Sequence, residues 1–199
     1  MIWRLLLLTL ASFVLAGEKP TLEPMLVLPE PRALRTARSV IPEGAKATVF
    51  SPAREIDHAP GVELYDAEEF AKLGVSPDTF VKRAEKAADR LLSAVQPELM
   101  KAADGRILYA VYRGERPIMA SLVIAPALPG LFEDLFGPEV WAVLPDRHSL
   151  YVFPAKKEAI AEFIADLAER YEDEPHAASS EIFALKKSAA PRVIGSFID

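Results

Sequence analysis

Cysteine is missing from all 199 residues of the sequence. Its absence excludes disulfide bonds, thiolate zinc sites and a lipid-modified N-terminal cysteine, so core packing alone must stabilise the fold. Histidine is scarce, with three residues, and there is no His-Glu-x-x-His helix motif, no Gly-x-Ser-x-Gly turn and no phosphate-binding glycine loop. These absences predict a chain without a bound metal or organic cofactor.

The sequence also lacks an excess of positive charge. Lys and Arg total 23 against 29 Asp and Glu, which gives a formal net charge of −6 at pH 7. The cations are scattered, without a basic stripe or an alternation of basic and aromatic residues. This pattern argues against nucleic acids and anionic lipid surfaces as partners.

The first residues, in contrast, carry the features of an export signal. Arg4 precedes an apolar run from Leu5 to Leu15, and small or short side chains at Val14 and Ala16 suit a signal peptidase. We expect residues 1–16 to be a signal peptide, which makes the protein periplasmic or extracellular and takes its net charge from −6 to −7 as Arg4 is lost. The run is shorter than the ~20 residues that cross a bilayer, so no membrane span should remain. A retained signal anchor and a buried N-terminal helix are the alternatives.

The chain that follows the signal is long enough for one domain with its own core. Its first part, residues 17–46, is rich in proline, which removes backbone donors and disfavours helix in the preceding residue. We expect this segment to be extended, with a helical turn at 34–38, and to precede an α+β domain over residues 47–199 that begins with a strand at 47–51. The prolines of residues 17–60 are Pro20, Pro24, Pro29, Pro31, Pro42, Pro52 and Pro60.

Helix signals begin at residue 66. Asp66 can cap a short helix over residues 67–73 that ends at Gly74. Ser76 as N-cap and Pro77 at the first helical position then predict a longer helix. Its expected core face consists of Phe80, Ala84, Ala87, Leu91 and Val95.

The most periodic segment is "KKEAIAEFIADLAERY", residues 156–171. Lysines stand at its N-terminal end and acids follow its C-terminal end, which opposes the helix dipole, so packing must stabilise this helix. Its apolar stripe is Ala159, Ile160, Phe163, Ile164, Leu167 and Tyr171. A shorter helix or turn-rich connection is expected over residues 128–137.

Strand patterns occupy the remaining segments. Residues 106–125 predict two strands joined by a two-residue turn at Gly114 and Glu115. The continuous apolar segments "VWAVL" and "SLYVF" predict two strands buried on both faces. The element order predicts an α+β fold, with a single domain and a largely antiparallel sheet that has helices packed on one face. The two buried strands correspond to residues 140–144 and 149–153, and a final strand pair is expected at 181–187 and 192–197.

The segments "VELYDAEEFAKLGVSPDTFVKRAEKAADRLL", "ASLVIAPAL", "VWAVLPDRHSLYVF" and "EPHAASSEIFAL" form a series along the chain. Together they resemble the YtpQ-like family of bacterial proteins, a domain of unknown function, over residues 47–187. The resemblance implies a strand and helices, then a second strand with a short helix, a hairpin and a closing strand. The family has no established activity or catalytic residues to carry over. His148 stands where the family tends to have Asp, and the proline-rich segment replaces a longer N-terminal region.

The first candidate site is the turn that holds Asp146, Arg147 and His148. With Ser149 as a nucleophile, these groups could form a hydrolytic set. Adjacent residues point in different directions, however, and Pro145 followed by Asp146 is a favourable turn pair. We therefore interpret the segment as a plain hairpin turn whose polar groups face water. A contact between Arg147 and a ligand carboxylate or phosphate is the functional alternative.

The second candidate site is the acidic run Glu172, Asp173 and Glu174 with His176, whose side chains are of the kinds that bind metals. Their spacing matches no defined metal loop, and the glycine that sharp calcium loops use is missing. We interpret the run as a solvated helix end and expect no metal there.

Two functions remain open from the sequence. The first is an exported, non-enzymatic domain that binds a secreted or envelope protein, with the proline-rich arm as a contact strand. The alternative is a hydrolase or small-ligand enzyme that uses residues 146–148. A His148 imidazole within hydrogen-bond reach of a carboxylate, in a concave pocket, would favour the enzyme.

Overall fold

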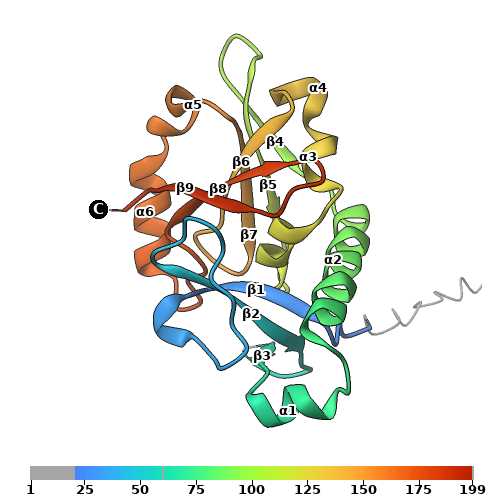
Figure 1. Ribbon diagram of the computed structural model, residues 1–199. Helices are drawn as coiled ribbons and strands as arrows, with labels where there is room; N and C mark the ends of the chain where they lie inside the picture. The colour runs from blue at the N-terminus through green and yellow to red at the C-terminus, as the bar shows by residue number, and fades with distance from the viewer. Residues whose placement is uncertain (1–20, 60, 199) are drawn as a thin grey trace, which may run out of the picture.

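The computed structural model describes residues 21–59 and 61–198, so the signal peptide predicted at 1–16 lies outside the described residues. Two antiparallel sheets organise the chain (Figure 1). Sheet A has the strand order β1-β2-β3, and sheet B has the order β4-β5-β7-β6-β8-β9. The strands of sheet A are β1 (Leu26–Pro31), β2 (Thr48–Glu55) and β3 (Val62–Leu64). The strands of sheet B are β4 (Glu98–Lys101), β5 (Ile107–Arg113), β6 (Glu139–Val143), β7 (Ser149–Pro154), β8 (Glu181–Lys186) and β9 (Arg192–Ser196).

The hairpin predicted around the 146–148 turn is confirmed. β6 and β7 pair in antiparallel register, with Trp141 opposite Phe153 and Val143 opposite Tyr151. Both strands are apolar on both faces, as their continuous hydrophobic sequence predicts. This pair forms the centre of sheet B, with β5 on one side and β8 on the other.

The proline-rich segment contributes strand β1 and the short 3-10 helix η1 (Arg32–Leu34). β1 lies at the edge of sheet A, where Pro29 and Pro31 remove backbone donors from a strand that has a partner on one side only. Its residues Leu26, Val27 and Leu28 are buried in the same hydrophobic cluster as the inner face of sheet B. The core therefore extends to residue 26.

The two helices predicted from residue 66 are confirmed. In α1 (Ala67–Lys72), Asp66 and Glu69 form a capping box, and Gly74 follows with a φ of 64°. In α2 (Pro77–Ala94), the Ser76 side chain accepts a hydrogen bond from the backbone amide of Thr79. The buried face of α2 is Phe80, Ala84, Ala87, Ala88 and Leu92, so Leu92 is more deeply buried than the predicted Leu91.

The second strand predicted within 106–125 is wrong. Only β5 forms there, and "MASLVI" is instead a fully buried 3-10 helix, η2 (Met119–Ile124). β5 already pairs with β4 and β7, so neither of its edges is free for a following strand. A short apolar run has the same appearance in a buried strand and in a buried helix, and the pairing of β5 decides between them.

Helices on both sides of sheet B complete the fold. The connection after η2 contains α3 (Leu128–Leu131) and α4 (Glu133–Phe136), and α4 ends at Gly137 as predicted. The helix expected over 156–171 is divided into α5 (Lys157–Ala161) and α6 (Ile164–Asp173). The break places the Phe163 ring 4.9 Å from that of Tyr109, while the predicted core residue Ile164 is 36% exposed.

The layers follow from these faces (Figure 1). α5 and α6 cover the side of sheet B that presents Val111, Val143 and Phe153, whereas α2, η2 and sheet A cover the opposite side. The structure confirms an α+β fold of one domain with antiparallel sheets. We expected helices on one face of the sheet, but helices cover both faces of sheet B. The second helical layer is needed because the central strands are apolar on both faces. In residues 21–59 and 61–198, no helix has the length and hydropathy to cross a membrane.

The phenol of Tyr112 gives a test of this core. The side chain is 1% exposed, and burial raises its pKa to about 12 from an ordinary value of 10.0. Between these two pH values the unfolded chain loses the phenolic proton while the folded chain keeps it, so the free energy of unfolding falls as pH rises. We expect a loss of roughly 2 kcal/mol from this group between pH 9 and pH 11.5. Urea titrations at pH 9 and pH 11.5 measure it.

Tyr112→Phe provides the control for this prediction. The variant lacks the ionisable group, so its loss of stability between the two pH values should be smaller by the same amount. An equal alkaline loss in the two proteins would contradict the assignment to Tyr112.

Candidate functional site

The turn at residues 145–148 is not a solvent-facing bend, so this part of the sequence interpretation is wrong. Asp146 is 1% exposed and Arg147 is 9% exposed. The turn is covered by the segment before β8, because the amide of Arg147 donates to the His176 carbonyl at 3.1 Å and that of Ala178 donates to the Pro145 carbonyl at 3.2 Å. Residues 176–178 therefore shield Asp146 and Arg147 from water.

Asp146 fixes the shape of the turn. Its Oδ1 accepts the backbone amide of His148 at 2.7 Å, and its Oδ2 accepts the Ser149 hydroxyl at 2.8 Å. Arg170 of α6 approaches Oδ2 at 3.4 Å. All of these contacts neutralise or satisfy a buried carboxylate, which would otherwise be costly. Asp146 thus acts as a structural anchor between the hairpin and α6.

Arg147 forms a buried ion pair with Glu30 of β1. Its Nε donates to Oε1 at 2.9 Å and its terminal nitrogen donates to Oε2 at 2.7 Å, in the bidentate geometry that favours arginine. The Glu30 side chain is 0% exposed. Burial raises the pKa of Glu30, and the hydrogen bonds and charge of Arg147 oppose that rise. The sequence allows a ligand carboxylate as the partner of Arg147. In the structure, the Glu30 carboxylate of the same chain occupies that position.

His148 does not complete a catalytic set with its neighbours. Its Nδ1 lies 3.1 Å from the Gly114 carbonyl oxygen, which can only accept, so Nδ1 carries the proton. The rings of His148 and His176 are 6.5 Å apart. In the described turn, no hydrogen bond joins the His148 imidazole to the Ser149 hydroxyl or to a side-chain carboxylate. Ser149 is buried and donates to Asp146 instead.

Further buried polar groups lie beside this turn, between sheet A and strand β8. The hydroxyls of Thr48 and Ser179 are 2.6 Å apart, and Glu181 accepts the backbone amides of Lys46 and Ala47 at 2.7 and 3.1 Å. We call the set Glu30, Thr48, Arg147, Ser179 and Glu181 the polar seam. Its bonds fix sheet A relative to sheet B, which is a structural role.

The acidic run lies at the end of α6. Glu172 and Asp173 are exposed, and Glu174 and His176 are half-buried. No group of three or more potential ligands in residues 21–59 and 61–198 is arranged to hold a metal ion. Glu172 and Asp173 face solvent, whereas His176 contacts the turn through its backbone carbonyl, which accepts the Arg147 amide.

A groove of about 710 Å³ lies on the side of α2. One wall is the segment 37–43, and another is formed by α2 together with residues 123–129. The turn at 185–191 closes one part of the rim. Phe50, Phe70 and Phe80 give the groove an aromatic lining, extended by aliphatic Val27, Val81 and Ile124. We call this feature the apolar groove.

Several apolar side chains of the groove remain in contact with water. Val40 is 60% exposed, Ile41 is 40% exposed and Val81 is 39% exposed. Exposed apolar side chains that cluster in one place do not stabilise the fold, because they remain in water. Such a cluster points to a binding surface. Volume and lining both match the usual properties of small-ligand sites.

A second hollow of about 480 Å³ lies between α6 and the strands β5 and β7. Its arginines already have partners within the chain. Arg113 pairs with Glu98 at 3.0 Å and stacks on Tyr151 at 5.8 Å, and Arg170 pairs with Asp146. This hollow is therefore a weaker candidate than the apolar groove.

No known protein family, no curated protein and no solved structure matches the chain, so the site is judged on its own geometry.

No motif in the sequence predicts the apolar groove. Its lining comes from β1, β2, α1, α2, η2 and the end of β8, whose residues are far apart in the chain. The apolar lining residues within helices and strands, such as Phe50, Phe70 and Phe80, have the pattern of core positions in their own elements. The wall at 37–43 belongs to the proline-rich segment 17–46, which the sequence predicts as a contact strand.

The Glu30–Arg147 pair leads to a stability prediction. Arg147→Met leaves the Glu30 charge buried without a partner, so we expect the free energy of unfolding to fall by about 3–5 kcal/mol. Adding Glu30→Leu removes the orphaned charge and should restore most of this loss. Chemical denaturation at pH 7 measures both. Arg106→Met is the control, because the Arg106 side chain is 69% exposed. A loss in Arg147→Met no larger than in Arg106→Met would refute the role of the pair.

Proposed function

We propose that the chain is an exported, non-enzymatic binding domain and that the apolar groove is its binding site. One observation carries this proposal: a groove of about 710 Å³ with an aromatic lining keeps Val40, Ile41 and Val81 accessible to water. Pockets of this size and character bury most of the surface of a small ligand. Membership of the YtpQ-like family is a separate proposal, which rests on the resembling segments and adds no substrate.

The hydrolase alternative has no comparable support. A serine nucleophile needs a base within hydrogen-bond reach and access to the substrate. Ser149 is buried and donates to Asp146, and His148 is bonded to a main-chain carbonyl. Neither His148 nor Ser149 lines the apolar groove or the hollow beside α6.

The export part of the proposal rests on the order of charge, apolar run and cleavage site in residues 1–16. Residues 1–25 fused to a β-lactamase without its own leader should direct the enzyme to the periplasm, and the recovered protein should begin at Gly17. Leu7→Asp with Leu8→Asp should abolish export, because charge interrupts the apolar run; Leu8→Ile is the control. Cytoplasmic fusion protein that retains Met1 would contradict export.

The groove part of the proposal is tested with Nile red, a neutral dye whose fluorescence rises in apolar surroundings. The native protein should bind the dye saturably at one site. Val40→Glu places a charge on an exposed wall position, so it should weaken binding by about tenfold without lowering the thermal midpoint.

Leu131→Glu is the matched control for this measurement. Leu131 is 59% exposed, close to the 60% of Val40, but it does not line the groove. Equal weakening by the two substitutions, or an absence of saturable binding, would reject the groove as the binding site.

A further inference from the structure

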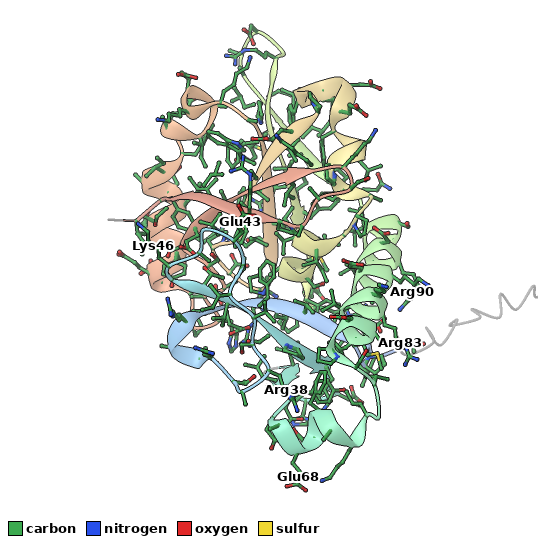
Figure 2. All side chains as sticks on the ribbon, viewed as in Figure 1. Arg38, Glu43, Lys46, Glu68, Arg83 and Arg90 are labelled. Carbon is green, nitrogen blue, oxygen red and sulfur yellow. The ribbon has the colours of Figure 1, made fainter. Side chains whose placement is uncertain are left out.

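Arg38 stands on the rim of the apolar groove in a defined arrangement. Its guanidinium lies 5.4 Å from the centroid of the Phe70 ring, which is itself part of the lining. Figure 2 shows Arg38 near α1 and the start of α2. Stacking on an aromatic face restrains a guanidinium and leaves the N–H groups at its edge available as donors.

A second stacked arginine shows what Arg38 lacks. Arg54 lies 5.2 Å from the Tyr65 ring, and its N–H groups are occupied by Glu63 and Glu69. Arg38 has the same kind of stacking, but no carboxylate among the described residues lies within ion-pair distance of it. The donors of Arg38 therefore remain for a group that residues 21–59 and 61–198 do not supply.

The other charges of the rim favour one ligand orientation. The lining contains two cations, Arg38 and Lys186, and Lys186 is already paired with Glu139 at 2.7 Å. Its acidic groups are Glu43 and Glu85. Figure 2 shows Glu43 near β9, away from Arg38. The Glu43 carboxylate repels an anion, whereas Arg38 attracts one. An anionic head is thus directed to the Phe70 end of the groove.

The walls favour an alkyl chain over a peptide. A peptide needs partners for its backbone N–H and C=O groups when it is buried, and proline has no N–H to offer. Proline lines the groove at Pro42, Pro52, Pro77, Pro126, Pro129 and Pro191. An alkyl chain has no polar groups to satisfy, so these walls accept it without that cost.

We infer that the apolar groove binds an amphiphilic carboxylate, such as a free fatty acid, with its head on Arg38 and its tail along the apolar walls. This inference rests on the groove being the binding site of the proposed function. It identifies Arg38 as the residue that selects a carboxylic acid over a neutral or cationic amphiphile.

Displacement of Nile red by dodecanoate, dodecanol and dodecylamine, each below its micelle concentration, tests the inference. The wild-type protein should bind dodecanoate about tenfold more tightly than dodecanol, since a charge-assisted pair with arginine adds to the apolar contacts. Arg38→Met should remove this preference and leave the affinity for dodecanol unchanged. Arg35→Met is the control, because Arg35 is exposed in the same segment but does not line the groove.

Other outcomes overturn the inference in distinguishable ways. Equal affinities for dodecanoate and dodecanol in the wild-type protein, or tighter binding of dodecylamine, would remove the role of Arg38 while leaving the groove as a binding site. Tighter binding of an apolar decapeptide blocked at both ends would assign the groove to a protein partner. Failure of every probe, including the dye, would reject the proposed function together with the inference.

Discussion

The ion pair between Glu30 and Arg147 is the constraint on which the arrangement of the two sheets depends. A carboxylate that is fully buried in β1 can be tolerated only if a cation reaches it, and Arg147 does so from the β6–β7 turn. The position of Arg147 then determines where sheet A lies against sheet B. The Thr48–Ser179 and Glu181 contacts reinforce the same placement, because each has a partner in only one relative position of the sheets. With the sheets fixed in this way, segment 37–43 becomes one wall of the apolar groove.

Local sequence signals predicted the local structure well. Asp66, Ser76 and Pro77 marked helix starts because capping involves residues that are close in sequence. The β6–β7 hairpin followed from two apolar runs around a turn. The signals failed where a distant neighbour decides the conformation. Residues 119–124 read as a strand, but β5 has no free edge to pair with them, and this depends on β4 and β7.

The candidate site was harder to predict for the same reason. Turn chemistry explains Asp146 and its hydrogen bonds, but burial of the turn depends on Glu30 and on residues 176–178, which no local pattern connects to it. The residues of the apolar groove carry no motif, since its apolar members in helices and strands look like ordinary core positions. Arg38 likewise has no distinguishing neighbours in the sequence; its role follows from the Phe70 ring beneath it.

The 117-residue separation of Glu30 from Arg147 has a consequence for biosynthesis. β1 leaves the ribosome long before the cation that neutralises it. Seating β1 earlier would place a lone carboxylate in an apolar interior, so the nascent chain has no stable position for its first strand until the hairpin has emerged. Most of the polypeptide must therefore be made before the final topology is reached. A chain with this delay stays incompletely folded during most of its synthesis, which is the state that the export proposed from residues 1–16 would require.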